Sequence, residues 1–425
     1  MGGDGLAKST DFSVDYRMQK QENITHSENY SLGLRVIIDK KSVVSSTCVF
    51  SEESLTNFVD QCVEMARESE ADQFIDYPTN LTNITQESID KLDLYDDYKP
   101  SVEKLQEMAL KTEDAALAVK GITNSEGSCA SYENDQYIFC NSLGFYQDYQ
   151  VTNNSISVAV LAQNNDNMET DYDYSSKIFF SDLKNPEDVG QKAAEKVLKK
   201  LDSRKVKTGV FPVVFCNELS GSLVGNLAAA INGSAICNGN SFLINDLNKR
   251  IFPEYINIID DPLIKRGLGS SPFDAETVIG QSRNIVENGV LKTWLLDMRS
   301  ANKLGLKTTG HASRSISSQP YPSSTNLYME NGNISLKDLI KDIKQGLFVT
   351  NSFGMGINII TGDYSQGANG FWIENGEITY PVSEITIASN FYDMFANITP
   401  ANDLEFRGSV NAPSLRIAKM TVAGQ

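Results

Sequence analysis

The sequence predicts an α+β protein with two domains. First, apolar and polar residues alternate over many short segments, as they do in half-buried strands. Second, amphipathic segments of helical periodicity are concentrated in the first half of the chain, which predicts helices on one face of a mostly antiparallel sheet. Third, the second half is strand-rich and contains one strongly apolar helix, which predicts a barrel-like antiparallel sheet around a buried helix. A polar, basic stretch at 202–208 separates the predicted domains, 1–205 and 206–425.

In the N-terminal domain, three helices are predicted, and two of them have a recognisable start signal. Ser51 with Glu52 and Glu53 starts the first helix, a second spans 101–120, and a third begins at Asn185-Pro186, where Pro suits the first helical position. An acidic loop is predicted at 72–100 and a polar tip at 166–173. The predicted strands are 12–18, 21–27, 32–38, 43–50, 122–132, 136–141, 145–152 and 155–163.

The C-terminal domain is organised around Val213–Phe242. A strand at 213–216 leads into an apolar helix with Asn217 as the expected N-cap and Asn232-Gly233 as its stop. Gly221, Gly225 and Ala228–Ala230 predict a thin side that packs closely against another backbone. Between Asn217 and Gly233 the helix has no His, Asp or Cys and only one Glu, at its start, so the helix as written cannot hold a metal.

Two Asn-Gly pairs, at 288–289 and 375–376, are strong hairpin signals in this domain. Short helices are expected at 300–304, 335–344 and 390–396. The predicted strands are 241–247, 255–259, 277–287, 290–296, 326–330, 347–350, 370–374, 377–381, 385–388 and 414–422.

Composition excludes several classes of function. The formal charge is −18, from 37 basic and 55 acidic residues, and no basic cluster is visible, which argues against nucleic acid and anionic membranes as partners. No apolar run approaches the roughly 20 residues of a membrane span. The N-terminus has neither the basic nor the apolar region of a signal peptide, so a cytoplasmic location is expected.

Catalytic motifs are absent from the sequence. The two histidines, His26 and His311, lie in different predicted domains, and no H-E-x-x-H or G-x-S-x-G motif occurs. His311 lies on a Gly/Ser-rich loop beside Arg314, where a contact role is favoured over assistance to a serine nucleophile. Asp260-Asp261-Pro262 fits general acid–base chemistry less well than a turn held by side-chain to backbone hydrogen bonds.

The C-terminal domain resembles the TldD/PmbA family, specifically its PmbA (TldE) branch, once called modulators of DNA gyrase. The N-terminal domain resembles the family more loosely, chiefly at Ser31–Val36. The segments that carry the resemblance are Asn238–Leu243, Ile259–Pro262, Gly267–Asp274, Ala301–Gly310, Pro322–Tyr328, Thr361–Ala368 and Asn402–Ser409.

The resemblance implies a subunit of a cytosolic zinc-dependent peptidase that trims unfolded peptides. In that system a TldD-type subunit carries H-E-x-x-x-H on a helix and binds the zinc, and a PmbA-type subunit pairs with it. Counting back without gaps from Gly239 places the motif at Val224–Ala229, where both histidines and the glutamate are missing. The expected role is therefore a non-catalytic subunit that binds no cofactor of its own, is inactive alone and forms a heterodimer, with a homodimer in isolation as the alternative.

Three polar residues in Gly-rich loops of the matched domain, Arg314, Asn358 and Arg407, are the candidates for a peptide groove or a subunit interface. A structural hydrogen bond is the plainer interpretation of each. Two other functions stay open from the sequence: an autonomous hydrolase with a non-zinc site near His311, and a modulator that binds gyrase or another protein. No catalytic or metal-binding residue is assigned.

Overall fold

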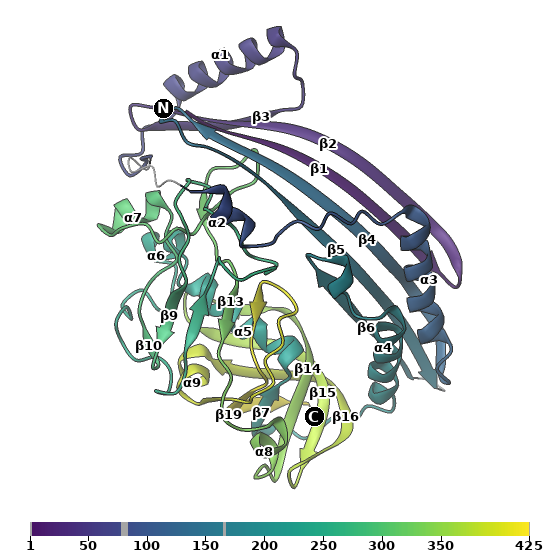
Figure 1. The fold of residues 1–425 in the computed structure, drawn as a ribbon. Helices are drawn as coiled ribbons and strands as arrows, with labels where there is room; N and C mark the ends of the chain where they lie inside the picture. The colour runs from purple at the N-terminus through teal and green to yellow at the C-terminus, as the bar shows by residue number, and fades with distance from the viewer. Residues whose placement is uncertain (1, 78–83, 165–166, 425) are drawn as a thin grey trace.

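A long, curved antiparallel sheet, sheet A, forms the N-terminal half of the chain (Figure 1). The structure is a computed structural model and describes residues 2–77, 84–164 and 167–424. Residues 78–83 of the predicted loop and Asp166 of the predicted tip lie outside the described residues. The strands, in the spatial order β3-β2-β1-β4-β5-β6, are β1 Gly2–Arg17, β2 Lys20–Ile38, β3 Lys41–Thr47, β4 Ile122–Asn141, β5 Tyr146–Asn164 and β6 Asn167–Lys177.

Several predicted strands of sheet A are in fact continuous. The polar segment Glu133–Asp135, predicted to interrupt two strands, lies in the middle of β4 and pairs with both β1 and β5. Asp11 stands opposite Glu133 on one side, and Asn153 stands opposite it on the other. Pairing with a strand on each side satisfies the backbone N–H and C=O groups of this segment. Because one face of an antiparallel sheet can be hydrated, polar side chains are compatible with a strand here.

The predicted polar tip at 166–173 is also wrong, because residues from Asn167 onward belong to β6. Its carboxylates are neutralised by basic side chains distant in sequence. Asp171 lies 2.8 Å from Lys200, and Asp173 lies 3.0 Å from Lys196. Compensated in this way, an acidic segment forms an edge strand instead of a solvated loop.

Helices cover sheet A at its two ends, α1 at one and α3 with α4 at the other (Figure 1). The predicted cap at Ser51 is confirmed, since its hydroxyl accepts from the backbone N–H of Ser54, and α4 begins with Pro at its first position as predicted. Ser101, for which no cap was predicted, accepts from the backbone N–H of Lys104 in the same way. A short helix that was not predicted lies within the expected loop. The bounds are α1 Glu52–Glu68, α2 Gln86–Asp90, α3 Val102–Leu117 and α4 Pro186–Lys200, with a 3₁₀ turn at Phe180–Asp182.

The C-terminal half contains a closed five-stranded barrel, in the order β16-β15-β14-β7-β19, which pairing of β16 with β19 completes. Only the β7–β14 pair is parallel. Together with sheet A, this confirms the predicted α+β class and the barrel-like C-terminal domain. The bounds are β7 Gly209–Phe215, β14 Gln345–Asn358, β15 Asp363–Glu374, β16 Glu377–Asn390, β17 Ile398–Pro400 (attached to β19) and β19 Leu415–Ala423.

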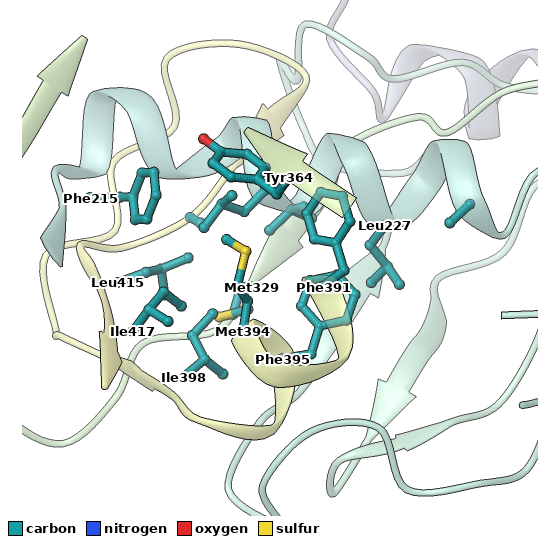
Figure 2. Close-up of a cluster of buried hydrophobic side chains, with 14 of the residues drawn as sticks. Phe215, Leu227, Met329, Tyr364, Phe391, Met394, Phe395, Ile398, Leu415 and Ile417 are labelled. Carbon is teal, nitrogen blue, oxygen red and sulfur yellow. The ribbon is translucent and has the colours of Figure 1, made fainter. Parts of the chain in front are cut away.

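The largest hydrophobic core lies between the barrel, helix α5 (Asn217–Ala230) and helix α9 (Phe391–Ala396) (Figure 2). Phe391 is fully buried at its centre, with ring centroids 5.6 Å from Tyr364 and 5.3 Å from Phe395. The edge-on contact with Tyr364 is a favoured aromatic geometry, so this cluster holds α9 and the barrel strands in fixed positions.

A second sheet, in the order β10-β9-β8-β13-β18, completes the C-terminal half. Both Asn-Gly turns are confirmed, with positive φ at each Asn and each Gly. The remaining elements are α6 Gly233–Cys237, β8 Ile258–Asp260, β9 Arg283–Glu287, β10 Val290–Leu291, α7 Met298–Leu304, β11 Ala312–Ser313, β12 Tyr321–Pro322, β13 Leu327–Met329, α8 Leu336–Ile340 and β18 Val410–Asn411.

Four predicted strands of this half are wrong or too long: 241–247 forms no strand, and 255–259, 277–287 and 290–296 are strands only at 258–259, 283–287 and 290–291. Residues 241–247 form turns, since the Ser241 hydroxyl donates to Ala230 O and accepts from Leu243 N. Residues 277–282 do not pair, because Asp274 accepts the backbone N–H of Val278 and closes a turn there. None of the described helices has both the length and the apolar character needed to cross a bilayer.

Candidate functional site

Helix α5 occupies the place where the resemblance locates a zinc motif. Its N-cap is Cys216 and not the predicted Asn217, which is the first helical residue and donates through Nδ2 to Asp403 O at 2.9 Å. One face, including Leu223 and Leu227, is buried in the C-terminal core. Ser222 and Ala229 are exposed on the other side, and the side chain of Glu218, at the start of the helix, is 27% exposed.

The small residues of α5 differ in how closely other parts of the chain approach them. A Cβ on Gly221 would lie 2.8 Å from Val410 O, so here the predicted close approach of a second backbone is confirmed. A Cβ on Gly225 would meet no atom within 4 Å, and Ala229 is exposed. The prediction of tight packing along the whole thin side is therefore wrong for the part that includes Gly225 and Ala229.

The residues at the expected zinc positions do not fit the metal. Val224, Gly225 and Ala229 stand where the motif has His, Glu and His, and none has a nitrogen, oxygen or sulfur donor in its side chain. Val224 is 1% exposed and belongs to the hydrophobic core. Over residues 2–77, 84–164 and 167–424, no group of three His, Cys, Asp or Glu side chains has an arrangement that would hold a metal ion.

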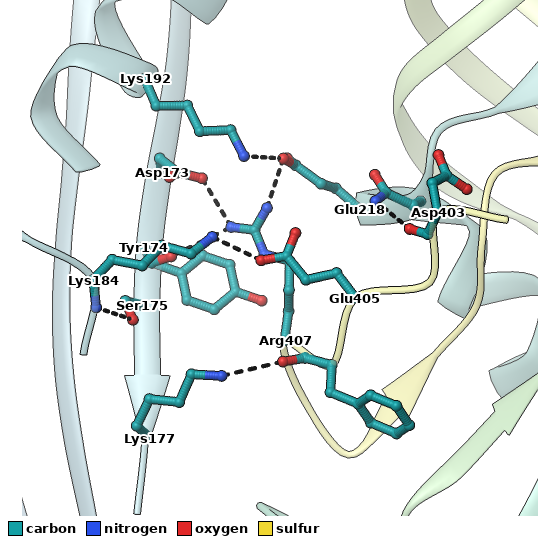
Figure 3. Close-up of polar contacts among 12 residues, drawn as sticks. Asp173, Tyr174, Ser175, Lys177, Lys184, Lys192, Glu218, Asp403, Glu405 and Arg407 are labelled. Atoms are coloured by element: carbon teal, nitrogen blue, oxygen red, sulfur yellow. Dashed lines mark hydrogen bonds and ion pairs between the residues drawn. The ribbon is translucent and has the colours of Figure 1, made fainter. Parts of the chain in front are cut away.

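A dense network of charges surrounds the N-terminus of α5 (Figure 3). Arg407, from the loop before β18, lies 2.6 Å from Glu218 and 2.8 Å from Asp173, and its guanidinium is 4.8 Å from the centre of the Tyr174 ring. Lys196 of α4 contacts the same two carboxylates, at 2.5 and 3.0 Å. The network thus joins sheet A, α4 and α5 through side chains that are far apart in the sequence.

The network holds Glu218 ionised. Burial raises the pKa of Glu218, but hydrogen bonds from Lys192 and Lys196 and the charge of Arg407 outweigh burial and lower the pKa to about 2. Burial lowers the pKa of Arg407, and its contacts with Asp173 and Glu218 raise it above its usual value. These groups keep opposite, fixed charges near neutral pH, as expected of a structural clamp.

His311 lines a cavity of about 350 Å³ between sheet A and the loops at 262–280 and 310–325. Its Nδ1 lies 2.8 Å from Thr309 Oγ1, and its Nε2 lies 3.3 Å from Asp260 Oδ1, with both side chains of the His–Asp pair nearly inaccessible. Asp260 also accepts the backbone N–H and the hydroxyl of Thr325. Both ring nitrogens of His311 are thus engaged within the protein, and the hydroxyl at Nδ1 comes from Thr309 and not from a serine.

Asp274, at the same cavity, connects two loops. Its carboxylate accepts three backbone N–H groups, from Glu276, Val278 and Ala312. Burial, together with the charge of Glu276, raises its pKa to about 7 despite these hydrogen bonds. The remaining member of the predicted acidic turn, Asp261, accepts from Leu263 N at 2.8 Å, as in an ordinary Asp-Pro turn.

The three candidate groove or interface residues lie in three different environments. Arg407 belongs to the network at α5, and Arg314 lines the cavity beside His311. Asn358 ends β14, where its side chain accepts from the backbone N–H of Ile360 at 2.9 Å. The partners of Arg407 were not predicted, because a carboxylate on a distant strand leaves no local signal; only Glu218, the single acidic residue at the start of an apolar helix, was noticeable in the sequence.

Comparison with known proteins covers nearly the whole chain. Models of the PmbA/TldA metallopeptidase family match in three parts: domain 1 over residues 6–66, the central domain over 95–201 and the C-terminal domain over 208–424. Metalloprotease PmbA of Escherichia coli O157:H7 is 37% identical over 422 residues, which are 99% of this chain and 91% of that protein.

Solved structures show the same fold. A crystal structure from Bacteroides thetaiotaomicron, described as a proposed modulator of DNA gyrase, matches with a TM-score of 0.90 at 27% identity and covers 100% of this chain and 94% of that one. TldE from Thermococcus kodakarensis matches with a TM-score of 0.86 over 100% of this chain and 96% of that one, and at 19% identity this likeness concerns the fold alone.

Proposed function

Because the chain belongs to the PmbA/TldD metallopeptidase family, we propose that it is the non-catalytic, PmbA-type subunit of a cytoplasmic zinc-dependent peptidase complex that degrades unfolded peptides. A TldD-type partner supplies the zinc and the catalytic glutamate. This chain completes the peptide channel and stabilises the partner.

The observation that carries the proposal is which residues α5 has at the positions where zinc ligands are expected. Its expected zinc positions hold Val224, Gly225 and Ala229, which offer nothing to bind zinc or to activate a water molecule. The helix itself is held in place by the Arg407 network and by the C-terminal core. A helix that keeps its position without metal ligands fits a subunit that supports catalysis in another chain.

The test combines metal analysis with a peptidase assay. The purified chain, the TldD-type protein of the same organism and their mixture are assayed for zinc by mass spectrometry and for cleavage of an unfolded peptide. Cleavage by the mixture that exceeds cleavage by either chain alone, and that a chelator abolishes, is expected. Stoichiometric zinc in this chain, or cleavage by this chain alone, would refute the proposal.

The His311→Ala variant tests the alternative that this chain is itself a hydrolase with a site near His311. Since both ring nitrogens of His311 are engaged by Thr309 and Asp260, we expect the mixture to keep its activity with this variant, apart from any loss that matches a loss of folded protein. A mixture of this chain with a TldD-type partner whose motif glutamate is replaced by Gln is the matched control and should be inactive. Activity of this chain alone that His311→Ala removes would favour the hydrolase.

A further inference from the structure

The cavity beside His311 is formed by two parts of the chain that are far apart in the sequence. Its volume is about 350 Å³, near the lower end of the range of small-molecule pockets, roughly 300–1,000 Å³. Strands β4 and β5 of sheet A form one wall, and the loops at 262–280 and 310–325 form the other. None of its described lining residues belongs to α5 or to the Arg407 network, so the cavity is separate from the helix on which the proposed function rests.

The wall on sheet A is aromatic. Tyr137 and Tyr149 stand opposite each other on β4 and β5, and the rings of Phe139 and Tyr149 are nearly parallel, with centroids 6.4 Å apart. The buried Phe273 packs edge-on against Phe139 and Tyr149, with ring centroids 5.2 and 5.6 Å away. These contacts fix the rings. Because Tyr137, Phe139 and Tyr149 line the cavity and stay partly exposed, they offer flat apolar surface to a ligand.

The opposite wall supplies a permanent positive charge and hydroxyl groups. Arg314 lines the cavity and reaches strand β1, where a Cβ on Gly5 would lie 3.6 Å from Arg314 Nη2 and 3.8 Å from Phe139 Cε1. The guanidinium therefore lies next to the aromatic wall. Ser313 and Ser324 line the same cavity, and within the described part of the chain their hydroxyls form no hydrogen bond.

The only carboxylate among the described lining residues is Asp274, and its oxygens accept backbone N–H groups from its own loop and from Ala312. Burial raises its pKa to about 7, so the carboxyl is partly uncharged near neutral pH. Asp260, which contacts His311, accepts hydrogen bonds from Thr325 and does not line the cavity. The lining therefore favours an anion over a cation.

We propose that this cavity binds a small aromatic carboxylate, with its ring against the aromatic wall and its carboxylate at Arg314. Hydrogen bonds between a guanidinium and a carboxylate are charge-assisted and directional, and aromatic rings pack favourably against one another. The hydroxyls of Ser313 and Ser324 are donors for the remaining lone pairs of the carboxylate. The inference goes beyond the proposed function and does not depend on it. The small volume of the cavity suits a free acid with one ring and a short chain.

Matched ligands test the inference on the unchanged protein. 3-Phenylpropionate is the probe, and isothermal titration calorimetry with the full chain should show one site with a Kd of about 1 mM or tighter. 3-Phenylpropionamide keeps the shape but has no charge, and it should bind at least about tenfold more weakly. 3-Cyclohexylpropionate keeps the charge but has no aromatic ring, and it should bind about threefold more weakly.

Variants of the cavity wall provide a second test. Arg314→Gln removes the charge and should weaken binding of 3-phenylpropionate at least about tenfold. Ser313→Leu keeps the charge but fills part of the cavity, and it should weaken binding by a similar factor, about tenfold. Arg67→Gln, which replaces an exposed arginine of α1, is the control and should bind within about twofold of the natural chain. Thermal unfolding establishes that each variant is folded.

Three results would overturn the inference: no saturable binding, equal binding of the amide, or unchanged binding by a folded Arg314→Gln variant. Hydrogen exchange locates the ligand, with protection expected at 269–275 and 310–314; protection confined to other segments would also overturn it. The peptide Ala-Ala-Ala-Phe ends in the same ring and carboxylate, and it should bind no more tightly than 3-phenylpropionate. Tighter binding of the peptide would assign the cavity to peptide ends and would refute a free acid as the ligand.

Discussion

The guanidinium of Arg407 lies 2.6 Å from the carboxylate of Glu218, and this contact joins the loop before β18 to the first turn of α5. Asp173 of sheet A contacts Arg407, and Lys196 of α4 contacts Glu218. Lys196 also contacts Asp173, so the four side chains form one network. The position of the central helix therefore depends on charges supplied by both halves of the chain (Figure 3).

Arg407→Ala is expected to lower the free energy of unfolding by about 3 kcal/mol, because it leaves the fully buried carboxylate of Asp173 with only Lys196 as a partner. Urea denaturation measures the loss. Lys205→Ala, which removes an exposed ion pair with Glu384, is the control and should cost about 0–1 kcal/mol. Equal small losses in both variants would contradict a stabilising role for the network.

Glu218 should make the protein less stable in acid. Its pKa of about 2 in the folded chain lies below the ordinary value of about 4.3, so its contribution is complete above about pH 5 and is lost as the pH falls towards 2. Denaturation from pH 6 to 2.5 is compared with Glu218→Gln. The difference in unfolding free energy, about 2–3 kcal/mol near neutral pH, should shrink on acidification; a constant difference would contradict the pKa assignment.

Asp274 should make the protein less stable as the pH rises, which is the opposite of the effect of Glu218. Its pKa of about 7 lies above the ordinary value of about 3.9, so the stability it contributes is complete below about pH 4 and falls as the pH rises to 7. Relative to Asp274→Asn, the natural chain is expected to lose up to about 4 kcal/mol of unfolding free energy across this range. Parallel pH profiles for the two proteins would show that Asp274 is ionised throughout.

The two glycines of α5 predict opposite effects of the same substitution. Gly225→Ala should stabilise the chain by about 0.5–1 kcal/mol, because its side is open and Ala favours the helix. Gly221→Ala should destabilise it by about 1–3 kcal/mol, because the new Cβ meets Val410 O. Thermal unfolding of both variants is the measurement. Destabilisation by Gly225→Ala would mean that another group covers this side of α5.

Local features were predictable because their hydrogen bonds connect residues a few positions apart. Ser51 caps its helix, and Asn288-Gly289 and Asn375-Gly376 close hairpins, as their sequences indicate. That Val224, Gly225 and Ala229 have no donor atom for a metal is a property of the sequence alone, and the structure adds no test of it.

By itself, then, the sequence determined the α+β class, the capped helices, the hairpin turns and the lack of metal ligands at Val224–Ala229. Only the tertiary structure decided that Glu133–Asp135 continues a strand, that β7 pairs in parallel with β14, and that Arg407 reaches Asp173. Each of these outcomes depends on at least one partner that is 100 or more residues away. A charge or a polar strand is stable only where the folded chain brings such a partner to it, and no local pattern records where that partner lies.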